Sequence, residues 1–444
     1  MDEPGGSIGN QPGAIAQTMA GLQASLQTSP LESGAIGSAP VSHLLGPYQI
    51  RPLVERFFDC LHRPVRKNLV LLVSAFITLT AALRSGYGQL TLASVARALP
   101  LGTSFKDRYK RLNRFLDNSF FDPQGLTEGL FALLLGMASG PTTIPVVLDQ
   151  STIGAAQLLL AGIPQAGRIL PLALWVFTYG DIQNQPDRVK SQNFLEHLFI
   201  LRLLEAAPEC WTLCFLVDRG YARVSLALEL LRQPRVSFIL RTQKKVIIWR
   251  KKQGRWRKCS IGHLPLHYGQ PRRLERILYR EKHSIELDLI IYYEPGFKEP
   301  WYLLVPPGSA QWLPTLEVIA LYRRRMSIEQ GFRDFKTHLG VRGLQLQVRI
   351  PERVQRLLQA FTLAYALIVS LGMTPVAQMA RRRLEDPRIT ARHATTKILS
   401  ARTVAALLLC GLCGELLLSL QATLHQLIAY TLAGQGLYYL PQFL

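Results

Sequence analysis

The sequence predicts an α/β protein with a β-strand insertion and with helical N- and C-terminal regions. Three observations carry this prediction. Residues 47–125 have helical patterning, residues from about 140 to 240 mix short apolar runs with helical segments, and residues 241–310 alternate apolar and polar residues as strands do. The 444 residues exceed the usual size of one hydrophobic core, so two or three packed units are expected.

The composition excludes general disorder and a disulfide scaffold. Hydrophobic residues make up 48% of the chain and charged residues 18%, enough to bury a substantial core. Six widely scattered cysteines suit a reducing cytoplasm. Lys and Arg number 51 against 30 Asp and Glu, a net charge of +21. So large an excess requires a polyanionic partner, either nucleic acid or acidic lipid.

The start of the chain and its apolar runs decide between these partners. Residues 1–46 are rich in Gly, Ser, Gln, Ala and Pro, which predicts a flexible leader without a secretory signal. Residues 69–83 are the best membrane candidate, but these 15 residues fall short of the roughly 20 that a spanning helix needs. Residues 407–432 are interrupted by polar side chains. Both runs are therefore interpreted as core helices, which favours nucleic acid.

Residues 47–130 are predicted to form a helical DNA-binding region. Within it, residues 103–116 place Lys and Arg on one side of a helix and apolar residues on the other, with Ser104 as the N-cap. The alternative is an ordinary solvated face. The apolar stripe consists of Phe105, Tyr109, Leu112 and Leu116.

Short apolar runs predict the strands of a covered sheet, with helices at 194–204 and 222–231 between them. Asp149 and Asp218 each follow one of these strands, and the C-terminal ends of strands are where α/β proteins form their sites. Either residue alone is as well explained by a loop or a cap. The predicted strands are Ile144–Leu148, Ile169–Phe177, Trp211–Val217 and Val236–Leu240.

Residues 241–310 are predicted to form a small, basic, mainly antiparallel β insertion. Nine Lys and Arg residues, among them Lys244 and Lys245, crowd into positions 241–258 together with two Trp residues. Basic and aromatic side chains together suit phosphate contact and base stacking. A merely solvated hairpin is the alternative.

A predicted helix at residues 321–339 supplies a third carboxylate, Glu329. Two Asp residues on adjacent strands and a Glu on a packed helix are the set that a two-metal phosphoryl-transfer site requires. An intrahelical ladder of salt bridges is the simpler alternative. The polar residues that fall within an arc of about 80° on this helix are Tyr322, Arg325, Glu329, Arg333 and Lys336.

At these residues the chain resembles the DDE transposases of bacterial insertion sequences, in the branch called the insertion-sequence-four family. The signature of that branch, Tyr-x2-Arg-x3-Glu-x6-Lys, is met by Tyr322, Arg325, Glu329 and Lys336. Asp149 in LDQST and Asp218 in VDRGY are similar to the two Asp motifs of the family, although Gln150 and Gly220 depart from them. The resemblance covers roughly residues 140–345.

The resemblance implies a ribonuclease-H-like catalytic core at 140–345 with the β insertion at 241–310, followed by a helical region at 346–444. It implies two Mg²⁺ or Mn²⁺ ions, with Asp149, Asp218 and Glu329 as catalytic residues and metal ligands. Trp301 lies 21 positions before the signature Tyr, where the family can hold a Trp that stacks on a flipped base; a core position in a strand is the alternative. DNA contacts are expected from Tyr322, Arg325, Arg333, Lys336, Trp301, Arg219, Lys244 and Lys245.

The predicted function is a DNA transposase that cuts transposon ends and transfers the freed strand to target DNA. A homodimer on double-stranded DNA, with 346–444 as its interface, and a cytoplasmic, nucleoid-associated location without membrane contact are expected. Three alternatives stay open: a nuclease of the same fold that cuts without joining, a non-catalytic DNA-binding derivative, and a basic membrane-surface protein.

Overall fold

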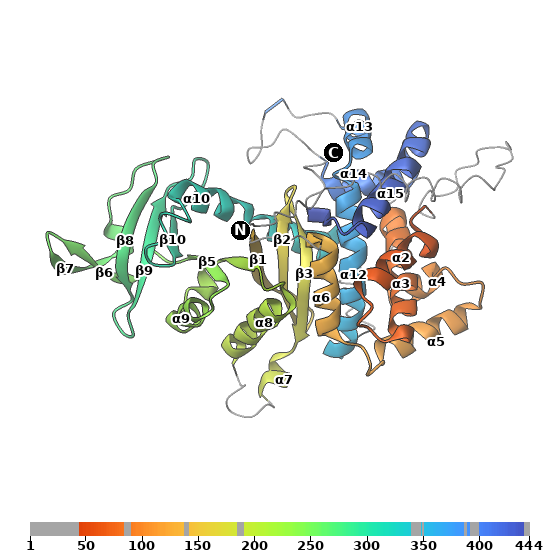
Figure 1. Ribbon diagram of the computed structural model, residues 1–444, viewed down its shortest axis with the longest axis horizontal. Coiled ribbons are helices and arrows are strands. Elements are labelled where there is room, and N and C mark those ends of the chain that lie inside the picture. The colour runs from red at the N-terminus through yellow and green to blue at the C-terminus, as the bar shows by residue number, and fades with distance from the viewer. Residues whose placement is uncertain are drawn as a thin grey trace, which may run out of the picture. The chain divides into compact units, whose positions relative to one another are not determined.

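The structure is a computed structural model that describes residues 44–83, 90–136, 142–183, 191–338, 348, 350–385, 389–390 and 399–438. Nearly all of the expected leader and the last residues of the expected core, 339–345, lie outside the described residues. Helices precede and follow a single mixed sheet within the described part (Figure 1).

Helices form the N-terminal region, as predicted. Ser104 caps α5, because its side chain accepts a hydrogen bond from the backbone N–H of Asp107 at 3.2 Å. The apolar stripe of α5 is shifted from the prediction: Leu112, Phe115 and Leu116 are buried, whereas Phe105 is 40% exposed. The helices are α2 (Pro47–Phe57), α3 (Arg63–Leu83), α4 (Leu92–Ala98), α5 (Phe105–Leu116) and α6 (Pro123–Leu135).

Ten strands form one sheet in the order β3-β2-β1-β4-β5-β10-β9-β8-β6-β7. β1, β4 and β5 are parallel, and β2 and β3 run antiparallel to one another beside β1. This mixed α/β architecture is the predicted one and is consistent with a ribonuclease-H-like core. The strands of this half are β1 (Thr142–Ile153), β2 (Ala156–Gln165), β3 (Arg168–Phe177), β4 (Trp211–Val217) and β5 (Val236–Arg241).

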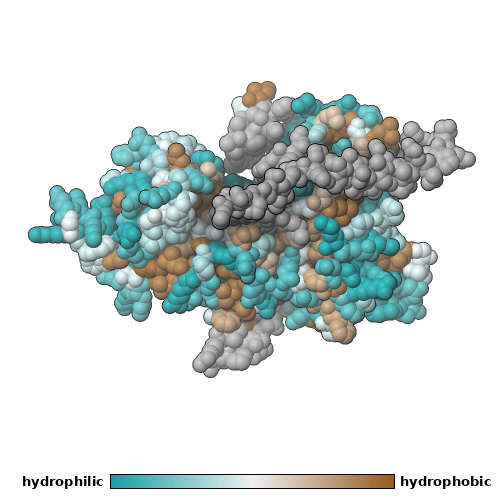
Figure 2. All heavy atoms as spheres, viewed as in Figure 1, coloured by the Kyte–Doolittle hydropathy of each residue, from teal (hydrophilic) through white to brown (hydrophobic). Residues whose placement is uncertain are grey.

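The β insertion extends the same sheet beyond β5, where β10 pairs antiparallel with β5. The β6–β7 hairpin ends the sheet, and residues 251–258 of it are exposed on both faces. Figure 2 shows a hydrophilic surface at this end of the molecule. The strands are β6 (Ile247–Lys252), β7 (Arg255–Ser260), β8 (Arg272–Tyr279), β9 (Ile285–Tyr292) and β10 (Trp301–Val305).

Helices α7 (Tyr179–Gln183), α8 (Gln192–Ala206) and α9 (Val224–Arg232) connect the strands of the first half, and α10 (Thr315–Arg324) and α11 (Ser327–Arg333) follow β10. The predicted helix at 321–339 is not continuous. It breaks at Arg325–Met326, where i to i+3 hydrogen bonds replace the α-helical pattern, and it ends in a π-helical turn at Asp334–His338.

The C-terminal region is helical, with α12 (Pro351–Leu371), α13 (Pro375–Leu384), α14 (Ala401–Leu409) and α15 (Leu417–Leu432). By length and composition, α3 and α12 are each long and apolar enough to cross a membrane. The segments 401–409 and 414–432, which meet at a bend of 91°, would form a third such span if they are counted as one helix. In the described fold, 89% of the apolar window of α12 is buried. α12 packs between β3 and α3 and also against α14 (Figure 1), which accounts for its apolar character.

Candidate active site

The pairing of two parallel strands places Asp149 beside Asp218. In the register of β1 with β4, Val147 lies opposite Leu216, and each Asp comes two residues further along its strand direction. β4 ends at Val217, whereas β1 continues to Ile153 because it still pairs with β2. The two carboxylates therefore lie side by side where the parallel pairing ends. The prediction that Asp149 follows the end of its strand is wrong, because pairing with β2 extends β1 past it.

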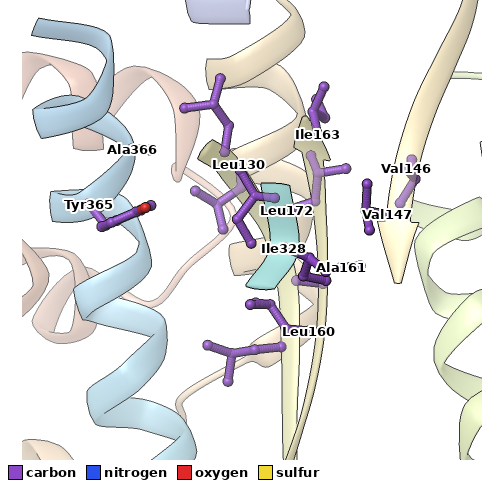
Figure 3. Packing of buried hydrophobic residues seen from close by; sticks show 14 of the residues in the cluster. Leu130, Val146, Val147, Leu160, Ala161, Ile163, Leu172, Ile328, Tyr365 and Ala366 are labelled. Atoms are coloured by element: carbon purple, nitrogen blue, oxygen red, sulfur yellow. The ribbon is translucent and has the colours of Figure 1, made fainter. Parts of the chain in front are cut away.

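The packing of α11 on the sheet brings Glu329 to the same place. Ile328 and Phe332 of α11 are buried, and Figure 3 shows Ile328 beside Leu172 of β3 and Ala161 of β2. Gly331 permits this close approach, since a Cβ at this position would lie only 2.7 Å from Cγ1 of Ile169. The helix thus rests on β3 by its apolar face and directs Glu329 toward β1.

One guanidinium group joins all three carboxylates. Nη2 of Arg325 lies 2.7 Å from Oδ2 of Asp149 and 3.6 Å from Oδ2 of Asp218, and Nη1 lies 3.1 Å from Oε1 of Glu329. The Arg325 side chain is only 5% exposed, whereas that of Glu329 is 50% exposed. Three acidic side chains that are distant in the sequence therefore surround a single buried cation.

The electrostatics of this cluster raise the pKa of both Asp149 and Arg325. Burial raises the pKa of Asp149, and the neighbouring carboxylates Asp218 and Glu329 raise it further, against the opposing effects of Arg325 and of the N–H of Gln150. Burial would lower the pKa of Arg325, but the surrounding acidic groups outweigh burial and raise it.

The three carboxylates are the right kind of ligand for a divalent metal ion, but in this structure they are not close enough together to hold one. Carboxylate oxygens are the ligands that Mg²⁺ prefers, and three of them converge on one cationic group here. Among the described residues, however, no three His, Cys, Asp or Glu side chains are grouped closely enough to hold a metal ion. The position between the carboxylates is taken by the guanidinium of Arg325.

Tyr322 and Trp301 lie beneath this cluster in the core. The hydroxyl of Tyr322 donates to Oδ1 of Asp218 at 3.4 Å, and burial, together with Asp218, raises the pKa of Tyr322. The ring of Trp301 packs edge-on against that of Tyr322, with 5.1 Å between centroids, and Trp301 is 2% exposed. Trp301 thus occupies a core position of β10 in this conformation, the alternative raised from the sequence, and no face of its ring is open to a base.

The other residues expected to contact DNA lie around the cluster in different settings. Lys336 donates to Oγ of Ser151, close to Asp149 along β1. Arg219 forms an ion pair with Glu299. Arg333, Lys244 and Lys245 are exposed.

Sequence reasoning missed a fourth carboxylate near the site, Glu196 on α8. It is 2% exposed and forms an ion pair with Arg223. Gln192 donates to both Glu196 and the side chain of Gln150, each at 2.7 Å, so a polar network reaches from Glu196 to the residue after Asp149. The signal available was a Glu within the mainly apolar run of residues 194–204, whose other polar residues are His197 and Arg202.

Part of this site lies in a segment that matches a known protein family. Residues 185–367 match the family model described as the transposase DDE domain. The match includes Asp218 and Glu329, and Asp149 precedes it. No curated protein matches the chain.

Residues 185–367 thus match a transposase DDE domain. Such a domain implies DNA transposition, with DNA as the partner and divalent metal ions as cofactors.

Proposed function

We propose that this protein is a DNA transposase of the insertion-sequence-four branch that cleaves transposon ends and joins them to target DNA. The observation that supports this most is the convergence of Asp149, Asp218 and Glu329 on one cation, just beyond the point where the parallel pairing of β1 and β4 ends. The spacing of Tyr322, Arg325, Glu329 and Lys336 supports the branch.

The proposed chemistry assigns the three carboxylates as ligands of two Mg²⁺ or Mn²⁺ ions. Such ions, when bound, activate the attacking oxygen and stabilise the leaving oxygen of an in-line displacement. The side chains of this chain hold the ions and orient the phosphodiester. Lys336, which projects beside Ser151, and the exposed Arg333 are positioned to contact phosphate oxygens near the cut.

DNA contacts away from the cut are proposed on two basic surfaces. The first is the β6–β7 hairpin with the loop before it, where residues 244–258 contain eight Lys and Arg and no acidic residue, and where Trp256 is 41% exposed. The second is a groove between α2, α3 and α5 that contains a single acidic residue, Glu55. Its basic lining residues are Arg51, Arg63, Arg66, Lys67 and Arg111.

The protein is proposed to act as a homodimer on double-stranded DNA, because two transposon ends must be joined, with 346–444 as the interface. It is proposed to work in the cytoplasm on the nucleoid. A nuclease of the same fold that does not join DNA is the nearest alternative.

Joining separates these two functions. The full-length protein is incubated with Mg²⁺, a plasmid target and a labelled, pre-cleaved duplex that carries a free 3′-hydroxyl and the inverted repeat flanking the coding region. Transfer of the label to the plasmid is expected, and Asp218→Asn should abolish it. Nicking of an uncleaved duplex without any joined product would contradict the proposed function and would indicate the nuclease.

A further inference from the structure

The position of Arg325 is unusual for a residue whose partner is DNA. Its guanidinium is almost completely buried, and it forms ion pairs with Asp149, Asp218 and Glu329. A phosphate of DNA can reach this group only if the group leaves those carboxylates. The same carboxylates have room for a divalent ion only if the guanidinium leaves, because a guanidinium and a metal ion at the same position repel each other.

The buried guanidinium is not fully satisfied where it lies. Its Nε is buried and has no hydrogen-bond partner among the described residues. A buried donor without a partner is costly, and an Arg presents its donors as a fork that matches phosphate oxygens. The present contacts therefore hold Arg325 by charge while leaving part of its hydrogen-bonding capacity for another acceptor.

Arg325 also lies at a point where the chain can change. It occupies the break between α10 and α11, where its N–H donates to the carbonyl of Tyr322 at 3.0 Å and its own carbonyl accepts from Ile328 at 3.2 Å. Tyr322 on one side of the break and Glu329 on the other both belong to the cluster. A rearrangement of this turn would move the guanidinium relative to Glu329 without unpacking either helix.

We propose that Arg325 is an internal counter-cation that keeps Asp149, Asp218 and Glu329 from binding divalent ions until a DNA phosphate withdraws its guanidinium. The inference rests on the proposed function and adds a regulatory step to it. Metal binding and DNA binding then strengthen each other. Bound DNA raises the affinity for the metal ions by the same factor by which bound metal ions raise the affinity for DNA. The cluster is thereby kept from taking up metal ions, and from cutting, when no DNA end is bound.

Direct measurement of Mn²⁺ binding tests this without any reaction. Free Mn²⁺ is titrated by electron paramagnetic resonance against the full-length protein, without DNA, for the wild type, Arg325→Gln and Arg241→Gln. Arg241 is the matched control, since it lies 3.8 Å from Asp218 but does not bridge the carboxylates. Arg325→Gln should bind Mn²⁺ about tenfold more tightly than the wild type, in the usual range of coupling, and Arg241→Gln should change affinity by less than about threefold.

A second arm adds the pre-cleaved duplex with the flanking inverted repeat. The duplex should tighten Mn²⁺ binding by about tenfold in the wild type and leave Arg325→Gln nearly unchanged. Thermal unfolding checks that Arg325→Gln folds. If it does not, Arg325→Lys replaces it in both titrations, because Lys keeps the charge but cannot bridge three carboxylates. The double variant Asp149→Asn with Arg325→Gln should lose the gained affinity.

The outcomes separate the inference from the function on which it rests. Equal Mn²⁺ affinity of the wild type and Arg325→Gln, at a site that Asp149→Asn removes, would overturn the role of Arg325 and leave the metal site standing. An equal gain in Mn²⁺ affinity for Arg241→Gln and Arg325→Gln would also overturn the role of Arg325 and leave the metal site standing. Binding that does not depend on Asp149 in any variant would overturn the metal site itself, and with it the proposed function.

Discussion

Nε of Arg168 on β3 lies 2.8 Å from Oδ2 of Asp334, and this ion pair ties the turn after α11 to the sheet. Arg402 of α14 lies 3.2 Å from the other oxygen of Asp334, and the hydroxyl of Tyr365 on α12 donates to Oδ2 at 2.8 Å. Asp334 is completely buried, and it follows Glu329 by five positions. Three elements therefore fix the end of the helix that carries Glu329.

Replacing Asp334 by Asn should destabilise the protein severely. The substitution removes the negative charge that faces the buried guanidinium groups of Arg168 and Arg402, which typically costs about 3–5 kcal/mol. Urea unfolding measures the cost. The matched control is Glu286→Gln, which breaks the exposed pair with Arg276 and should cost less than about 1 kcal/mol. Similar costs for the two variants would show that the buried network does not anchor α11.

Gly331→Ala should also lower stability, because the added methyl group would meet Ile169 at 2.7 Å. Overpacking of this kind costs about 1–3 kcal/mol. Ile169→Val in the same chain should restore part of the loss, since it removes Cδ1, the second atom in close contact at 2.8 Å. Gly414→Ala, with no atom within 4 Å, is the control and should change little. Additive effects of the two substitutions would argue against direct contact of α11 with β3.

Asp149→Asn should stabilise the protein at neutral pH while it abolishes cleavage. Burial raises the pKa of Asp149, so the folded state binds its proton more tightly than the unfolded chain does. The charged form therefore costs stability, and that cost fades as the pH falls through the raised pKa. Thermal unfolding from pH 7 down to about pH 4, the usual range of an Asp carboxyl, checks the sign. A stability difference that grows toward low pH would contradict the raised pKa.

Substitutions in the basic groove of the N-terminal helices should weaken DNA binding without regard to sequence. Removing one Lys or Arg that binds a phosphate should make the slope of log K against log salt concentration shallower by about 0.9. Fluorescence anisotropy of a labelled duplex compares Arg63→Gln and Lys67→Gln with the wild type. Arg232→Gln, an exposed Arg paired with Glu229 outside the groove, is the control. Equal reductions in affinity for Arg232→Gln and the groove variants would remove the groove from the DNA interface.

The strands of the sheet could be predicted where apolar and polar residues alternate or where an apolar run ends in a polar residue. β4 has the predicted bounds, and the alternation of residues 241–310 correctly predicts the β insertion. β2 could not be found in this way, because residues 156–164 are all buried and show no alternation. The extension of β1 past Asp149 depends on its pairing with β2, which the sequence of β1 alone does not contain.

The sequence indicated the candidate site residues, but it indicated less well how their side chains are arranged relative to one another. Spacing along one predicted helix indicated Arg325 and Glu329, although that helix breaks at Arg325, and the predicted strand ends indicated Asp149 and Asp218, although β1 continues past Asp149. The spacing did not predict that Arg325 would stand among the carboxylates, nor that Trp301 would be buried against Tyr322. The positions of Arg325 and Trp301 depend on contacts with side chains from distant segments. The spacing of residues along the sequence does not show which distant side chains pack together.

The proposed function depends most on the three carboxylates acting as one metal-dependent centre for cutting DNA. Its most direct test is nicking of a labelled duplex with the flanking inverted repeat, with and without Mg²⁺, by the wild type and by Glu329→Gln. We predict Mg²⁺-dependent nicking by the wild type and its loss, by a factor of at least about 100, in Glu329→Gln, with duplex binding retained. Nicking by Glu329→Gln at the rate of the wild type would contradict the assignment of this centre.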